Sequence, residues 1–146
     1  MKIGIFGLGY VGLPLAITFQ KKFNVIGYDL NPNKVDELNK NHDKNHEISA
    51  RILKKTKKLI FTSDINLLKD CKVIIIAVPT PINKNNSPDL TYLKMACIQA
   101  SKIIKKGTIL VFESTVYPGV TEEFCVPIIE KLSKLKYNKD FYCGYS

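Results

Sequence analysis

The sequence predicts an α/β domain with a doubly wound, mainly parallel sheet of about six strands and helices on both faces. Short β-branched runs alternate along the chain with segments of helical periodicity, a pattern typical of repeated strand–helix–strand units. Residues 73–78 are apolar throughout, as expected of a strand covered on both faces. A glycine-rich turn follows the first strand. The chain has 146 residues, 45% of them hydrophobic, which suits one domain.

The first half of the chain is expected to form three strands and three helices. After the first strand, Val11, Leu15 and Phe19 recur at helical spacing, and Pro14 is acceptable in a first helical turn. The expected elements are a strand at Lys2–Phe6, a helix at 11–23, a strand at 23–29, a helix opened by residues 31–33, a Lys-rich helix at 48–57 and a strand at Leu59–Thr62.

The second half is expected to add three strands and two helices. Leu93, Cys97 and Ile104 lie at helical spacing, and Gly107 is the expected C-cap of that helix. A later helix spanning 125–135 must kink at Pro127 or begin there. The expected strands lie at 73–78, Thr108–Phe112 and Phe141–Tyr145, with a polar loop at 83–88.

The charge of the chain is strongly positive, with 22 Lys and Arg against 13 Asp and Glu and a net charge of +9. Much of it lies in segment 40–58, where Lys40, Lys44, Arg51, Lys54, Lys55, Lys57 and Lys58 outnumber Asp43 and Glu47. This segment has no aromatic residue on which a base could stack. We therefore expect a solvated helix that helps to attract anionic ligands, and no nucleic-acid partner.

Membrane and secretory segments are not expected. The longest apolar run, residues 73–79, is too short to cross a bilayer, and the first residues lack the sustained apolar stretch of a signal peptide. We expect a cytoplasmic protein with no membrane partner.

Four cysteines are widely spaced, at Cys71, Cys97, Cys125 and Cys143. They form no Cys-x-x-Cys pair, and His42 and His46, which could share a helix face, have no further ligand nearby. No metal site is expected. Each cysteine has apolar neighbours, which predicts buried free thiols in a reducing compartment.

A phosphate-binding turn is predicted at residues 7–12, which read GLGYVG between a strand and a helix. Gly7 permits a tight turn, Gly9 lets the backbone approach a pyrophosphate, and Gly12 allows the helix to pack closely on the strand. Unpaired N–H groups at the helix N-terminus favour phosphate oxygens. The pattern predicts a Rossmann-type dinucleotide-binding domain; the alternative is a tight turn that binds nothing.

Asp29 completes the pattern at the end of the second strand. A carboxylate there would accept hydrogen bonds from the adenosine ribose and repel a 2′-phosphate, which favours NAD over NADP. Lys34 could reach a phosphate or pack over the adenine. The alternative role for Asp29 is that of a helix cap.

Two further loops follow strands and should meet at the same edge of the sheet. In the loop at 78–81, prolines on either side of Thr80 hold its hydroxyl and the flanking carbonyls rigidly. The loop at 113–119 places the hydroxyls of Ser114 and Thr115 before a helix. Either loop alone could be a Pro-rich turn or a helix cap. Together, beside a dinucleotide turn, they favour a ligand site.

The motifs at 7–12, 29, 78–81, 88–91 and 113–119 resemble those of the UDP-glucose/GDP-mannose dehydrogenases, over nearly the whole chain. The stretch from Glu113 through 125–127 to 144–146 is most similar to the branch that oxidises UDP-N-acetylhexosamines for capsular and O-antigen polysaccharides. The resemblance implies an NAD-dependent enzyme that oxidises the primary alcohol of a nucleotide sugar to a carboxylate. It uses two NAD, and a catalytic cysteine traps the aldehyde intermediate as a thiohemiacetal.

Carried over to this sequence, the resemblance implies NAD contacts at Val11, Asp29, Lys34, Thr80 and Thr115. It also implies that Thr115 lies near the nicotinamide and the catalytic water, which makes it the expected supporting residue for catalysis. With the motifs, the full set of expected cofactor-binding residues is Gly7, Gly9, Tyr10, Val11, Gly12, Asp29, Lys34, Val78, Pro79, Thr80, Ser114 and Thr115.

Members of this family are much longer than 146 residues. The resemblance implies that the catalytic Glu, Lys, Asn and Cys, the central helix and the substrate domain all follow Ser146. It also implies that Cys125 and Cys143 do not take the nucleophile's place. We therefore expect residues 1–146 to be an NAD-binding domain that is inactive alone, in a full-length protein that is a homo-oligomer.

Other functions stay open at this point. A 6-phosphogluconate or 3-hydroxyacyl dehydrogenase begins with similar glycines but lacks the combination of loops at 78–81 and 114–119. A non-catalytic module that senses cofactor occupancy would also lack a catalytic base and nucleophile. A nucleic-acid binder would be retained on DNA at physiological salt and released steeply as salt rises.

Overall fold

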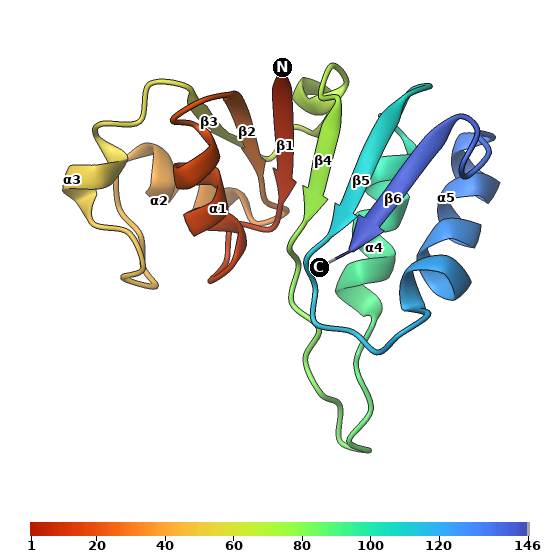
Figure 1. The fold of residues 1–146 in the computed structure, drawn as a ribbon. Helices are drawn as coiled ribbons and strands as arrows, with labels where there is room; N and C mark the ends of the chain where they lie inside the picture. The colour runs from red at the N-terminus through yellow and green to blue at the C-terminus, as the bar shows by residue number, and fades with distance from the viewer. Residues whose placement is uncertain (146) are drawn as a thin grey trace.

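Six strands form one parallel sheet in the order β3-β2-β1-β4-β5-β6 in the computed structural model, which describes residues 1–145 (Figure 1). Chain order reverses between β1 and β4, so the sheet is doubly wound, as predicted. The strands are β1 (Lys2–Phe6), β2 (Asn24–Tyr28), β3 (Leu59–Thr62), β4 (Val73–Ile76), β5 (Thr108–Phe112) and β6 (Phe141–Tyr145).

Helices cover both faces of the sheet. They are α1 (Gly12–Phe19), α2 (Pro32–Asn39), α3 (Ala50–Leu53), α4 (Thr91–Ser101) and α5 (Val126–Ser133), with a 3-10 turn, η1 (Ile65–Leu68), and a π-helical turn, η2 (Thr121–Cys125). Alternate residues of β4 point to opposite faces. Ile74 packs in a core with Leu93 of α4 and Ile129 of α5, whereas Ile75 packs with Ala16 of α1. β4 is therefore buried on both faces, which explains its continuous apolar sequence as predicted.

The predicted element boundaries need several corrections. α1 ends at Phe19, and the Phe19 carbonyl accepts the N–H groups of Lys22 and Phe23 in the turn that leads to β2. β4 ends at Ile76, so residues 77 and 78 belong to the following loop. α4 ends at Ser101 with Lys102 as its C-cap, and Gly107 is not the cap. Gly107 instead adopts φ +84° in the turn before β5.

The expected Lys-rich helix at 48–57 is wrong. Only the single turn α3 is helical, because Leu53 alone among its residues is buried and a helix without an apolar face gains little from packing. A buried carboxylate organises the preceding loop instead. Asp43, 6% exposed, accepts hydrogen bonds from the N–H groups of Asn45, Glu47 and Ile48 at 2.9–3.1 Å.

The two histidines do not share a helix face, because neither His42 nor His46 is helical. His46 adopts φ 56° in the loop that Asp43 holds. Pro127 stands in the first turn of α5, so of the two alternatives for that proline it marks the start of the helix. The chain enters α5 directly from η2.

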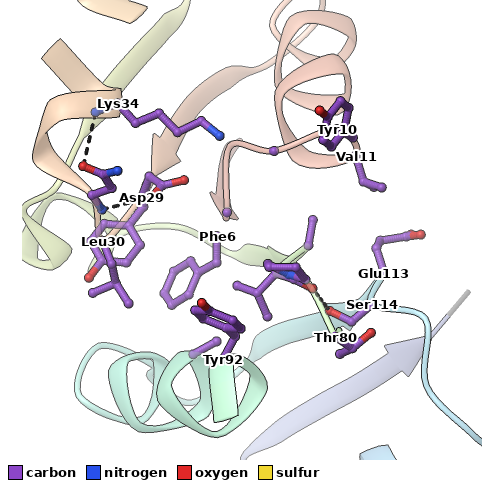
Figure 2. A pocket seen from close by; sticks show the side chains of 18 of the residues that line it. Phe6, Tyr10, Val11, Asp29, Leu30, Lys34, Thr80, Tyr92, Glu113 and Ser114 are labelled. Atoms are coloured by element: carbon purple, nitrogen blue, oxygen red, sulfur yellow. Dashed lines mark hydrogen bonds between the residues drawn. The ribbon is translucent and has the colours of Figure 1, made fainter. Parts of the chain in front are cut away.

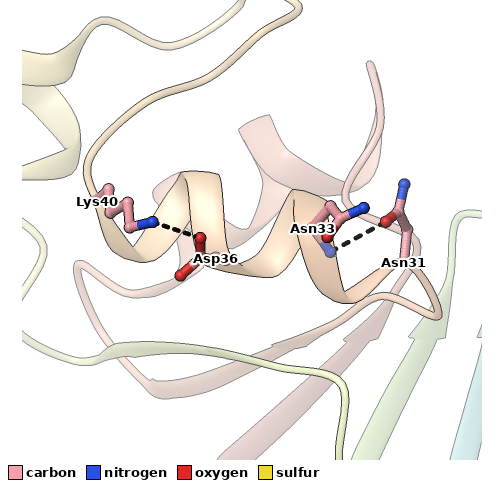
Figure 3. Close-up of polar contacts among 4 residues, drawn as sticks. All are labelled: Asn31, Asn33, Asp36 and Lys40. Atoms are coloured by element: carbon pink, nitrogen blue, oxygen red, sulfur yellow. Dashed lines mark hydrogen bonds and ion pairs between the residues drawn. The ribbon is translucent and has the colours of Figure 1, made fainter.

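α2 begins where a side chain caps it (Figure 3). Asn31 Oδ1 accepts hydrogen bonds from the N–H groups of Asn33 at 3.1 Å and Lys34 at 3.4 Å. The Lys40–Asp36 ion pair, 2.6 Å long, lies on the exposed side of the same helix, where such pairs contribute little. The cap fixes the loop between β2 and α2.

The cysteines are free thiols, as predicted. Cys71, Cys97 and Cys125 are buried, and Cys143 is half-buried. Burial raises the pKa of Cys71 to about 11 and of Cys143 to about 12, so both stay protonated at neutral pH. Within residues 1–145 there is no group of His, Cys, Asp and Glu arranged to hold a metal ion. No helix of this part is long and apolar enough to cross a membrane.

Candidate cofactor site

A pocket of about 620 Å³ opens at the carboxyl ends of β1, β2, β4 and β5 (Figure 2). This is where the strand order reverses, the position at which open parallel sheets bind ligands. The volume falls within the range of about 300–1,000 Å³ typical of small-molecule and cofactor sites. The walls come from the glycine-rich turn, the β2–α2 loop, the loops after β4 and β5, and α4.

The glycine-rich turn packs so tightly that side chains are excluded from two of its positions. Gly7 adopts φ +87°, and a Cβ there would lie 2.8 Å from the carbonyl oxygen of Ala77. A Cβ on Gly12 would overlap the carbonyl oxygen of Gly7. Gly9, by contrast, lines the pocket, and a Cβ added there would meet no atom within 4 Å. Gly7 and Gly12 thus build the turn, and Gly9 leaves room for a ligand.

Asp29 joins the turn to the β2–α2 loop. Its Oδ2 accepts a hydrogen bond from the N–H of Leu8 at 2.9 Å, and its Oδ1 accepts one from the N–H of Asn31 at 3.0 Å. Each carboxylate oxygen has a further lone pair, so both can still accept a bond from a ribose hydroxyl. The helix-cap alternative is wrong, because Asn31 caps α2.

Lys34 lies in the first turn of α2, and its side chain extends over the pocket (Figure 2). A smaller polar pocket of about 380 Å³ adjoins this end. Lys34, Asn31 and Asn45 line both. Asn45 reaches this position because Asp43 holds its loop.

The end of the pocket near Asp29 has an apolar wall. Phe6, Leu30 and Tyr92 lie together there (Figure 2). The rings of Phe6 and Tyr28 pack with their centroids 4.9 Å apart. Burial, and then the charges of Asp29 and Asp64, raise the pKa of Tyr28, so its phenol stays neutral. An apolar wall beside a carboxylate and a lysine suits a flat base attached to a ribose and phosphates.

The opposite end is formed by the two loops after β4 and β5. Ser114 Oγ donates a hydrogen bond to the carbonyl of Val78 at 2.7 Å, and Thr80 Oγ1 donates one to the carbonyl of Thr115 at 2.7 Å. The Thr115 side chain is exposed at the pocket and its hydroxyl has no hydrogen-bond partner within residues 1–145. Glu113 also lines this end (Figure 2).

The structure brings the predicted site residues together in this one pocket, except that Gly12 lies buried beneath the turn. Several lining residues were not singled out from the sequence, namely Phe6, Tyr28, Leu30, Asn31, Asn45, Ala77, Tyr92, Ala96, Gln99 and Glu113. Leu30 and Glu113 could have been found from the sequence, because each lies directly beside a predicted site residue at the end of a strand. Tyr92 and Asn45 reach the pocket only through the tertiary fold.

The strand order, the glycine-rich turn and the acidic end of β2 together define a Rossmann-type dinucleotide-binding domain. Residues 1–146 match the NAD-binding domain of the UDP-glucose/GDP-mannose dehydrogenase family, and the chain belongs to this family.

Curated relatives match the chain over its whole length. It is 49% identical over 146 residues to a UDP-N-acetyl-D-glucosamine 6-dehydrogenase of Pseudomonas aeruginosa, covering 100% of this chain and 35% of the relative. It is 51% identical over 144 residues to protein CapL of Staphylococcus aureus, covering 99% and 34%. The chain thus spans about a third of the length of these relatives.

Solved structures show the same architecture. UDP-D-ManNAc dehydrogenase of Pyrococcus horikoshii superposes with a TM-score of 0.91 at 35% identity, over 99% of this chain and 35% of that one. The ternary complex of GDP-mannose dehydrogenase of P. aeruginosa gives a TM-score of 0.93 at 32% identity, with the same coverage. The predicted fold, family and cofactor class are therefore confirmed.

Proposed function

We propose that this NAD-binding domain serves a nucleotide-sugar 6-dehydrogenase that oxidises the primary alcohol of a UDP-N-acetylhexosamine to a uronic acid, using two NAD. The observation that carries the proposal is the convergence of the glycine-rich turn, Asp29 and the Thr80 and Ser114 loops on one pocket. The sugar class is supported by the 49% identity to a UDP-N-acetyl-D-glucosamine 6-dehydrogenase over the whole chain.

The pocket suggests how the dinucleotide is held. The pyrophosphate would lie against the N–H groups of the turn near Gly9, where no side chain intervenes. The adenosine would lie at the end lined by Asp29, Lys34 and the apolar wall. The nicotinamide would lie between the loops that carry Thr80 and Thr115, with Thr115 supporting the catalytic water. Bound NAD supplies the hydride acceptor.

Residues 1–146 would bind NAD without turning over a nucleotide sugar. We propose that the catalytic nucleophile, the central helix and the substrate domain lie outside this chain, since it spans about a third of its relatives. The full-length protein would be a cytoplasmic homo-oligomer that acts in capsular or O-antigen polysaccharide synthesis. The free thiols are compatible with a reducing compartment.

Calorimetric titration of the chain with NAD, and with NADP in parallel, tests the cofactor assignment. Binding of NAD in preference to NADP is expected, because a 2′-phosphate would meet the Asp29 carboxylate. A preference for NADP would overturn it.

The substrate assignment needs a protein of the relatives' length. With NAD and UDP-N-acetylglucosamine or UDP-N-acetylgalactosamine, it is expected to form two NADH for each sugar oxidised. Oxidation of UDP-glucose alone would overturn the proposed sugar class.

A further inference from the structure

The two loops at the Thr80–Ser114 end of the pocket are joined by side-chain hydrogen bonds. The last backbone hydrogen bond between the β4 and β5 segments runs from the N–H of Glu113 to the carbonyl of Ile76, at 2.9 Å. Beyond it, the chains separate toward α4 and η2. Two side-chain hydroxyls continue the pairing, one from each loop, and each donates to a carbonyl of the other loop at 2.7 Å.

The Ser114 bond leaves that hydroxyl no proton for a ligand. A serine hydroxyl has one proton, and in Ser114 it is donated to the Val78 carbonyl. Ser114 is only 7% exposed. Within residues 1–145, the Val78 carbonyl has no other hydrogen-bond donor. Loss of the Ser114 hydroxyl would leave this carbonyl unpaired at the edge of the pocket.

We propose that Ser114 is a positioning residue. Its bond to Val78, together with the bond from Thr80 to Thr115, sets the separation of the two loops and so the shape of the end of the pocket that takes the nicotinamide. This inference rests on the proposed function. It replaces direct cofactor contact as the role of the Ser114 hydroxyl, and it leaves the adenosine end of the pocket independent of this bond.

The test compares NADH with ADP, which lacks the nicotinamide half, as ligands of the 146-residue chain. Ser114→Ala should weaken NADH binding about tenfold, because the variant loses the hydrogen bond to the half-buried Val78 segment and the loop is displaced. ADP binding should change less than about twofold, because ADP occupies the adenosine end of the pocket, which does not depend on the Ser114–Val78 hydrogen bond.

Ser101→Ala is the matched control. Ser101 is also 7% exposed and its Oγ also donates to a carbonyl at 2.7 Å, that of Ile98. This bond lies within α4, and Ser101 does not line the pocket. Its loss should lower thermal stability as the Ser114 variant does, without a selective loss of NADH.

Two substitutions at Thr80 test the second bond and keep the proposal testable if Ser114→Ala does not fold. Thr80→Val keeps the shape of the side chain but removes the hydroxyl, and should weaken NADH selectively. Thr80→Ser restores the hydroxyl and should recover most of the affinity lost in Thr80→Val. The double variant Ser114→Ala/Thr80→Val should lose less than the product of the single losses, because both bonds hold the same two loops.

Unchanged NADH binding in Ser114→Ala and Thr80→Val would overturn the inference, and so would an equal loss of NADH and ADP. If the wild-type chain binds neither ligand, the proposed function itself fails. If the wild-type chain binds both ligands and Ser114→Ala loses no more NADH affinity, relative to ADP, than Ser101→Ala does, only the positioning role is overturned.

Discussion

The two sides of the pocket are held by different means. On the β1–β2 side, Gly7 lets the turn approach the Ala77 carbonyl just after β4, and Gly12 lets α1 approach the Gly7 carbonyl. Asp29 ties the turn to the next loop through backbone N–H groups. On the β4–β5 side, the backbone pairing has ended, and the hydroxyls of Ser114 and Thr80 join the loops.

This difference teaches what each side tolerates. The first side depends on close contact between backbones, so an added methyl group disrupts it sterically. The second side depends on single hydrogen bonds, so removing one hydroxyl oxygen weakens the link between the loops while the packing changes little. We expect large losses of stability from side chains added at Gly7 or Gly12 on the first side, and selective losses of affinity from hydroxyls removed on the second.

Of the substitutions that test this comparison, Gly12→Ala should have the largest effect on stability. The new Cβ would overlap the Gly7 carbonyl oxygen, so α1 must move away from β1, at a cost of about 3 kcal/mol in the free energy of unfolding. Urea denaturation measures it. Gly9→Ala is the control, because its Cβ meets no atom within 4 Å, and should cost less than about 1 kcal/mol. Equal stability of both variants would contradict the steric account.

Gly9→Val should abolish NAD binding, with an affinity loss of more than about 100-fold, while the fold stays intact. The side chain would occupy the space that we assign to the pyrophosphate. Calorimetry and thermal unfolding together measure the two effects. Gly144→Val is the control, since Gly144 also has open space around its Cβ position but does not line the pocket. Normal NAD binding by Gly9→Val would rule out this placement of the phosphates.

Asp29→Ala should weaken NAD binding by about tenfold and reduce the discrimination against NADP. The variant loses the ribose acceptor and the repulsion of a 2′-phosphate, together with the bonds to Leu8 and Asn31. Titration with both dinucleotides measures the ratio. Asp64→Ala removes a carboxylate that accepts the N–H of Asn66 after β3, and should leave the ratio unchanged. If both affinities were unaltered in Asp29→Ala, this residue would not belong to the ribose site.

Tyr28→Phe should have the smallest effect, visible only at high pH. Because burial and two carboxylates raise the pKa of Tyr28 above its ordinary 10.0 in the folded chain, the folded chain holds this proton more tightly than the unfolded chain does. The stability due to this preference is present below pH 10 and is lost as pH rises above it. Urea denaturation at pH 9 and pH 11 should show a smaller decline for Tyr28→Phe than for the wild type. An identical decline would mean that Tyr28 is not a titrating group of the first side.

The sequence was most informative at positions where only one residue type or one kind of element fits. The turn at 7–12 needs glycine at Gly7 and Gly12, and the apolar run at 73–78 contains the strand β4, which is covered on both faces, so the candidate site and the sheet could be predicted from them. Gly12 packs closely as predicted, but, unlike the other expected cofactor-binding residues, it does not line the pocket. The direction of the strands also followed from the alternation of strands and helices.

Other features depend on contacts that local patterns do not contain. The helix expected at 48–57 fails because tertiary packing buries only Leu53, and the buried Asp43 organises the preceding loop. The same loop brings Asn45 to the pocket. The sequence points to the hydroxyls of Ser114 and Thr80, but their acceptors lie some 35 residues away in the chain and depend on how β4 and β5 pair.

The strand order also bears on how this chain folds. β1 pairs with β4, so that Ile3 lies opposite Val73. The long segment between these residues must form a closed loop before the two halves of the sheet can meet. Contacts so distant in sequence are slow to form, because the entropy of closing a long loop is lost before any contact compensates it. The pocket straddles this junction, and neither half of the chain contains a whole site. A ligand of the pocket therefore recognises only chains in which the halves have joined, and by mass action it draws the population toward that state.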